Sequence, residues 1–135
     1  MNSALKNTIY VALGGAIGTL FRHGINVLTF SEQFPLGTVI ENLTGALALG
    51  LVTGFITTLN RAPDWLRTGV GVGFCGGYTT MSTFAADTFL LGVHSAPGLT
   101  LLYVGSSLVG GLLMAAGGIG LGKMAGDARG KRGLS

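Results

Sequence analysis

The stretch that decides the fold of this chain is Gly76-Gly77-Tyr78-Thr79-Thr80-Met81-Ser82-Thr83-Phe84, inside an uncharged run of 19 residues from 68 to 86. Two adjacent glycines weaken a helix by about 1 kcal/mol each relative to alanine. The hydroxyl residues that follow can bond to freed carbonyls or line a wet path. The stretch therefore predicts a helix that breaks inside a membrane and holds polar groups there, because unwound backbone at that depth must be buried or line a cavity. The alternative is a continuous helix whose hydroxyls bond to their own backbone.

The composition of the rest of the chain is typical of a membrane protein. Of 135 residues, 10% are charged and 48% are hydrophobic, whereas a soluble domain carries about 25% charged residues. A spanning helix needs roughly 20 mostly apolar residues. We predict an all-α domain over 1–125 with four transmembrane helices, the third of them broken, followed by a basic cytoplasmic tail over 126–135 that we expect to be disordered. The four helices are expected near 5–29, 36–59, 67–91 and 98–122.

The basic residues predict how the chain sits in the cell membrane. Four spans place both termini and the middle connection on one side. That side holds seven of the eight lysines and arginines: Lys6, Arg61, Arg67, Lys123, Arg129, Lys131 and Arg132. Arg22 falls on the other side, so the positive-inside bias predicts cytoplasmic termini. The basic tail can touch anionic lipid, and it is too short to indicate nucleic-acid binding.

The 25 glycines recur at a spacing that favours close helix packing in lipid. The spaced pairs are Gly14/Gly18, Gly50/Gly54, Gly69/Gly73, Gly73/Gly77 and Gly118/Gly122. One interpretation is tight packing within one bundle, and a second adds self-association. Four helices alone leave little interior for a pathway, so we favour a dimer.

Several polar side chains are expected inside the spans, where such residues are costly and mark functional sites. Thr38 and Asn42 are four apart and share a helix face, and Asn42 offers both donors and an acceptor. Glu41 is rotated by about 100° from Asn42. Arg22 is either an anchor at the interface or a vestibule charge that attracts an anion. Tyr103 is either a packing residue or part of a hydroxyl track.

The sequence does not favour an enzyme. His23 and His94 are isolated, and no nucleophile–base pair is evident. Cys75 is the single cysteine, which excludes an intrachain disulfide and a cysteine-based metal site.

These motifs resemble the Fluc (CrcB) family of bacterial fluoride channels across all the expected spans. Gly14-Gly15-Ala16-Ile17-Gly18 followed by Arg22 is similar to the first-helix pattern GGxxGxxxR, and Gly37-Thr38 with Asn42 and Gly45 is similar to GTxxxNxxG. The most specific likeness is that of residues 73–84 to GFxGGxTTFSTF.

The resemblance implies an antiparallel, dual-topology dimer with two fluoride pathways. It also implies a structural sodium ion at the dimer centre, held by backbone carbonyls that correspond here to Gly76 and Thr79. The pathway residues that it implies are Asn42, Phe84, Ser82, Thr83 and Tyr103, with Met81 and Thr38 beside them and Arg22 in the vestibule. The expected partners are fluoride, membrane lipid and a second subunit of opposite orientation.

Two departures from the family pattern bear on this interpretation. Met81 stands where the family usually has phenylalanine, and it lacks the positive edge of a ring. Glu41 precedes Asn42 where an apolar residue is usual, so we predict that it faces away from the pathway or is protonated.

Three alternatives remain at this stage. The steep charge bias suggests that the chain is one of a pair of oppositely oriented homologous subunits, rather than a homodimer. Met81 makes a non-conducting partner subunit conceivable. A small proton-coupled antiporter is the third alternative, although it leaves residues 76–80 unexplained.

Overall fold

The computed structural model describes residues 2–31, 34–60 and 62–132. The expected connections around 32–33 and Arg61, and the end of the expected tail at 133–135, lie outside the described residues. Within those ranges the regular structure is entirely helical. The elements are α1 (Ser3–Leu28), α2 (Leu36–Ile56), the π-helix η1 (Trp65–Phe74), α3 (Cys75–Tyr78), α4 (Ser82–His94) and α5 (Pro97–Arg132).

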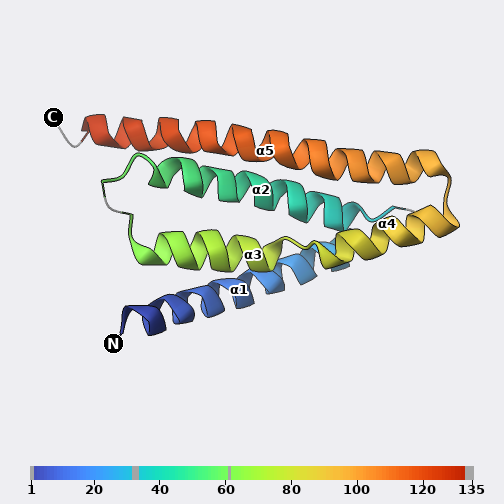
Figure 1. Ribbon diagram of the computed structural model, residues 1–135, viewed down its shortest axis with the longest axis horizontal. Helices are drawn as coiled ribbons and strands as arrows, with labels where there is room; N and C mark the ends of the chain where they lie inside the picture. The colour runs from blue at the N-terminus through green and yellow to red at the C-terminus, as the bar shows by residue number, and fades with distance from the viewer. Residues whose placement is uncertain (1, 32–33, 61, 133–135) are drawn as a thin grey trace.

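The helices run side by side along the long axis of the molecule (Figure 1). α2 packs along α5, and α1 packs against η1 and α3. Both ends of the chain lie at the same end of the bundle, together with the connection from α2 to η1 (Figure 1). The turn from α4 to α5 lies at the opposite end.

In the described part of the chain, three helices are long and apolar enough to cross a membrane: Ser3–Leu28, Leu36–Ile56 and Pro97–Arg129. Their outer faces carry large apolar side chains that the chain itself does not cover. Leu28 is 82% exposed, Leu101 73% and Leu112 74%. Because such surface is unfavourable in water, these faces suit lipid or another protein.

Glycines allow the backbones of α1 and the η1–α3 segment to touch. A Cβ on Gly14 would meet the carbonyl oxygen of Gly69, and one on Gly18 would meet that of Phe74. From the other side, a Cβ on Gly77 would meet the carbonyl oxygen of Gly15. The packing interpretation of the glycine spacing is therefore confirmed at this interface.

Close backbone contacts at glycines also join α2 to α5. A Cβ on Gly50 would meet the carbonyl oxygen of Ala115, and a Cβ on Gly54 would meet that of Ile119. In return, Gly118 faces the carbonyl oxygen of Leu47 and Gly122 faces that of Leu51. In lipid the hydrophobic effect does not drive helices together, so van der Waals contact between close backbones stabilises such pairs.

The last helix is longer than we expected from the sequence. It was expected to end near residue 122 and to be followed by a disordered tail, but α5 continues to Arg132. The residues beyond 122 include good helix formers such as lysine, methionine and alanine. In addition, Gly126 packs against Thr58 beyond the end of α2, so packing continues past the apolar run.

Candidate functional site

The helical run from Trp65 to His94 is interrupted at Thr79–Met81, which we call the break. Thr79 has extended backbone angles, with φ −80° and ψ 158°. Gly77 is pressed against α1 at Gly15, and Gly45 of α2 faces the side chains of Tyr78 and Thr79. The chain is therefore held from both sides just before it leaves the helix.

Asn42 on α2 ties down the break with both ends of its side-chain amide. Its Nδ2 donates to the carbonyl oxygen of Thr80 at 3.0 Å, and its Oδ1 accepts from the N–H of Thr80 at 2.8 Å. These bonds satisfy backbone groups that have left the helical ladder, as buried backbone groups require. Asn42 is thus the direct link between α2 and the break.

The carbonyls of Gly76 and Thr79 are among those that lose their usual helical donors at the break. In a continuous α-helix the N–H of Thr80 would bond to the carbonyl of Gly76, but it donates to Asn42 instead. The N–H of Thr83 would likewise bond to the carbonyl of Thr79, but it donates to the hydroxyl of Thr80 at 3.2 Å. The carbonyls of Gly76 and Thr79 are hard oxygen atoms, which suits them to a small cation.

A cavity of about 250 Å³ opens beside the break. Its lining comes from α2, the break, α4 and α5: Asn42, Thr79, Thr80, Met81, Phe84, Ser107 and Leu108. Met81 lines this cavity and is also 72% exposed. Ser82 is exposed too, and its hydroxyl lies 3.3 Å from that of Thr80. The cavity is therefore open on the side where Met81 is exposed.

A second polar cluster centres on Asp87 of α4. The hydroxyls of Thr38 and Tyr103 both donate to Asp87 Oδ2, at 2.8 Å and 3.0 Å. Thr38 is 2% exposed and Tyr103 is fully buried. Two hydroxyl donors from different helices thus converge on one side-chain oxygen of Asp87.

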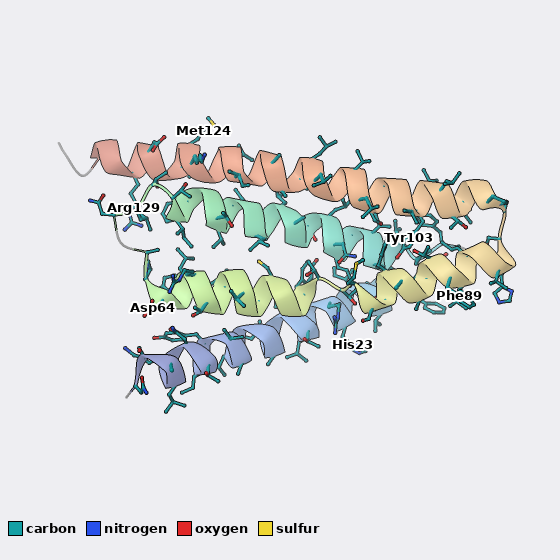
Figure 2. The ribbon with its side chains drawn as sticks, viewed as in Figure 1. His23, Asp64, Phe89, Tyr103, Met124 and Arg129 are labelled. Atoms are coloured by element: carbon teal, nitrogen blue, oxygen red, sulfur yellow. The ribbon has the colours of Figure 1, made fainter. Side chains whose placement is uncertain are left out.

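Aromatic rings connect this cluster to the cavity at the break. Phe84 stacks on Tyr103 with ring centroids 5.4 Å apart, and Phe34 meets Tyr103 edge-on at 5.7 Å. Figure 2 shows Tyr103 between α5 and α4, whereas Phe89 projects from the other side of α4. Phe84 lines the break cavity with Asn42, so a series of neighbouring polar and aromatic groups, which we call the path, connects Asn42 to Asp87 through Phe84 and Tyr103.

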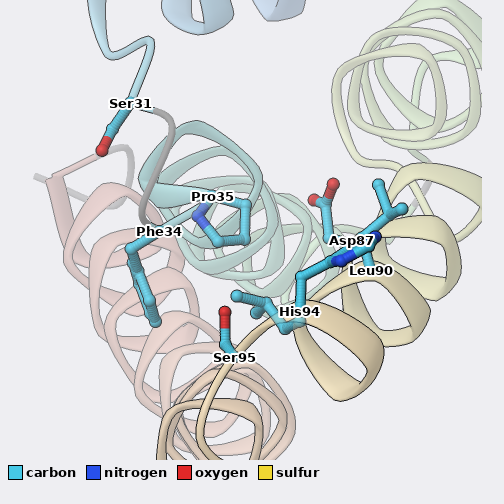
Figure 3. A pocket seen from close by; sticks show the side chains of 8 residues that line it. Ser31, Phe34, Pro35, Asp87, Leu90, His94 and Ser95 are labelled. Atoms are coloured by element: carbon cyan, nitrogen blue, oxygen red, sulfur yellow. The ribbon is translucent and has the colours of Figure 1, made fainter.

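Beyond Asp87 the path reaches two further cavities near the end of the bundle. One, of about 180 Å³, is lined by residues that include Asn26, Thr38, Thr83 and Asp87. The other, of about 330 Å³, is lined by residues that include Phe34, Asp87 and His94. Figure 3 shows Phe34 and Pro35 on one side of it, facing Asp87 and His94 on α4.

Glu41 points to α1 and is fully buried. Its Oε2 accepts from Asn26 Nδ2 at 3.0 Å, and Asn26 also donates to the carbonyl oxygen of Arg22. The Arg22 guanidinium interacts electrostatically with Glu41. Among the described residues Glu41 Oε1 has no hydrogen-bond partner, which is costly for a charged carboxylate.

The structure brings together most of the residues that we singled out from the sequence. Asn42, Met81 and Phe84 share the break cavity with Thr79, while Thr38 and Thr83 line the next cavity. Tyr103 lies between the two groups. Gly76 is exposed, and Arg22 is partly buried beside Glu41.

Sequence reasoning missed Asp87 and Asn26. Asp87 closes the uncharged run of the third segment and follows Phe84 by three positions, which places it on the same helix face. That spacing was the available signal. Asn26 follows Arg22 by four positions in the same way, but nothing in the sequence pairs it with Glu41.

A bundle of apolar helices around a broken helical run, with donors and aromatic rings beside the break, is typical of a polytopic membrane protein of the transport class. The chain matches the family described as "CrcB-like protein, Camphor Resistance (CrcB)" over residues 9–119. It therefore belongs to that family.

Curated relatives cover nearly the whole chain. It is 45% identical over 112 residues to "Fluoride-specific ion channel FluC 2" of Halalkalibacterium halodurans, which covers 83% of this chain and 82% of that protein. It is 44% identical over 127 residues to the protein of the same name from Bacillus licheniformis, with 94% and 95% covered. "Fluoride-specific ion channel FluC 1" of Bacillus cereus is 40% identical over 136 residues, with 97% and 92% covered.

Proposed function

We propose that this protein is a fluoride-specific ion channel of the cell membrane, which lets fluoride leave the cell passively and so reduces its toxicity. The observation that carries the proposal is the series of polar and aromatic groups from Asn42 to Asp87, in a chain whose relatives bear the name of fluoride channels. A passive channel for an inorganic anion needs no catalytic residues, so the protein is not an enzyme.

The chemistry of the path suits fluoride, which is small, strongly hydrated and a strong hydrogen-bond acceptor. A dry pore must replace its water with donors, and the Asn42 amide and the Thr83 hydroxyl are such donors. The hydroxyls of Thr38 and Tyr103 hold the Asp87 side chain beside them. Rings of Phe84 and Tyr103 have positive edges that attract an anion weakly. Weak attraction permits rapid passage.

The proposed fold in the membrane has four spans, with η1, α3 and α4 together forming a broken third span. Two copies lie antiparallel, each with its break at the dimer centre and a fluoride path on either side. The high exposure of Met81 and the open side of the break cavity support a partner there. The basic residues near both termini favour the orientation in which the termini of this chain are cytoplasmic.

The partner is a second copy or a homologous subunit of opposite orientation. The steep charge bias and the numbered names of the relatives, FluC 1 and FluC 2, support the paired form. Expression in bacteria that lack their own fluoride exporter tests both ideas. Rescue of growth in fluoride by this chain alone supports a homodimer, and rescue only with a second homologue supports a pair. Failure of both, with the protein in the membrane, contradicts the proposed function.

We further propose that a structural sodium ion lies at the dimer centre and is not transported. The carbonyls of Gly76 and Thr79 would hold it, since their helical donors are diverted to Asn42 and Thr80. A bound cation would balance the partial negative charge of these carbonyl oxygens and would hold the breaks of the two subunits together.

Removal of sodium is expected to stop fluoride flux. When sodium is replaced on both sides of a liposome by a large organic cation, the carbonyls at the break lose the ion that they coordinate. The contact between the two subunits at the dimer centre then loosens. Fluoride-electrode recordings should show flux fall to the level of empty liposomes and return when sodium is restored. Undiminished flux without sodium would contradict the proposed ion site.

Replacing Tyr103 with phenylalanine is expected to lower fluoride flux roughly tenfold, which corresponds to about one hydrogen bond. The ring keeps its stacking on Phe84, but the hydroxyl that donates to Asp87 is lost. Tyr10→Phe, on α1 near the chain termini, removes an equivalent hydroxyl away from the path and serves as the control. Equal flux in the two variants would exclude Tyr103 from the path.

A further inference from the structure

A cavity that the fluoride path does not use lies between α2, η1 and α5. Its volume is about 630 Å³, within the range of sites that hold small molecules. Its lining is almost wholly apolar: Leu51, Val52, Phe55, Leu59, Pro63, Trp65, Leu66, Gly122 and Ala125, together with Arg129. The cavity is therefore suited to a ligand whose apolar chain lies among these side chains and whose polar end meets the positive charge of Arg129.

The cavity lies toward the end of the bundle that carries the chain termini. Asp64, beside the lining residues Pro63 and Trp65, pairs with Arg67 at 3.8 Å, and both side chains are more than half exposed. Trp65 is 54% exposed, as is usual for an indole at a membrane interface. Figure 2 shows Arg129 and Asp64 at this same end. One end of the cavity thus meets headgroup depth, while its residues on α2 and α5 reach into the apolar spans.

Charge complementarity indicates which molecule fits. Among the described residues that line the cavity, Arg129 is the charged one, and it makes no ion pair within the described part of the chain. Lys123 is exposed on the same helix less than two turns away. A positive charge at headgroup depth above an apolar cavity attracts an anionic lipid, and an arginine fork bonds well to a phosphate.

We propose that this cavity binds an anionic phospholipid, with an acyl chain in the groove bordered by α2, η1 and α5 and the phosphate at Arg129. Ala125 in the lining has a small side chain, which leaves room for the acyl chain. At Gly122 the helices α2 and α5 touch through Leu51, which bounds the cavity on that side. The site is independent of the fluoride path, so its test does not depend on conduction.

Trp65 provides a direct probe, because it is the single tryptophan of the chain and lines the cavity. The full-length protein is placed in bilayers that contain either phosphatidylglycerol or phosphatidylcholine with brominated acyl chains, which quench tryptophan fluorescence on contact. Half-maximal quenching is expected at about fivefold lower content of the anionic lipid, since one arginine at the surface contributes about that factor.

Arg129→Gln is expected to abolish the preference, whereas Lys123→Gln, an exposed charge on the same helix, should leave it largely intact. Ala125→Phe fills the cavity and should reduce quenching by both lipids. Circular dichroism checks that each variant remains helical. Equal quenching by the two lipids would mean ordinary boundary lipid and overturn the proposal. An absence of quenching by either lipid would mean that protein covers the cavity, and it would overturn the proposal as well.

Discussion

Replacing Asn42 with leucine is expected to reduce fluoride flux by roughly 100-fold. The substitution removes both hydrogen bonds that hold Thr80, and leaving two buried backbone groups unpaired costs about 1–3 kcal/mol each. It also removes an N–H donor from the cavity beside the break. With the carbonyl and N–H of Thr80 unpaired, the break can shift, and the pathway and the proposed ion site are disturbed together.

Fluoride efflux from liposomes measures the effect, and size-exclusion chromatography checks that the protein remains folded. Asn60→Leu, on an exposed residue after the end of α2, is the matched control and should conduct like the unmodified protein. Asn42→Asp keeps an acceptor for the N–H of Thr80 but loses the donor and adds a negative charge. It should therefore also conduct poorly. Unchanged flux in Asn42→Leu would remove Asn42 from the mechanism.

Alanine at Gly18 is expected to destabilise the folded protein by about 1–3 kcal/mol or more, as overpacking of a tight core does. The new methyl group would meet backbone atoms of Phe74 and Tyr78, and backbone cannot move aside as a flexible side chain can. Gly118→Ala should act similarly, because its methyl group would meet backbone atoms of α2 at Leu47 and Leu51.

The chain offers a matched control on each helix. Gly24 on α1 and Gly120 on α5 have nothing within 4 Å of an added Cβ. Gly24→Ala and Gly120→Ala should therefore be neutral or slightly stabilising, since alanine is the better helix former. Thermal unfolding in detergent, followed by circular dichroism, compares the four variants. If all four unfold at the same temperature, close backbone contact does not hold these helices together.

The helices and their glycine contacts could be predicted from the sequence because both depend on local patterns. Uncharged runs set the helix lengths, and the Gly14/Gly18 spacing places both residues on one face. The end of α5 could not be predicted in this way. Composition marks the tail as polar, whereas its helix continues through packing of Gly126 on Thr58, a contact between residues far apart in the sequence.

The candidate site likewise contains residues that the sequence indicates and residues that only tertiary contacts reveal. Asn42 and the Gly76–Phe84 stretch stand out in the sequence because polar groups and adjacent glycines are costly inside a span. Asp87 did not stand out, because its importance depends on hydroxyls from α2 and α5 that converge on it. The Asn26–Glu41 hydrogen bond is likewise a tertiary contact. A residue whose role depends on several other helices is not visible in a one-dimensional pattern.

The most direct test of the central claim is passive anion efflux from liposomes that hold this protein, alone or with its co-expressed homologue. Fluoride and chloride are compared under the same gradient, with sodium present. We expect rapid fluoride efflux that needs no proton gradient, and chloride efflux no faster than from empty liposomes. Equal efflux of both anions, or efflux of a cationic drug driven by protons, would contradict the assignment of a fluoride-specific channel.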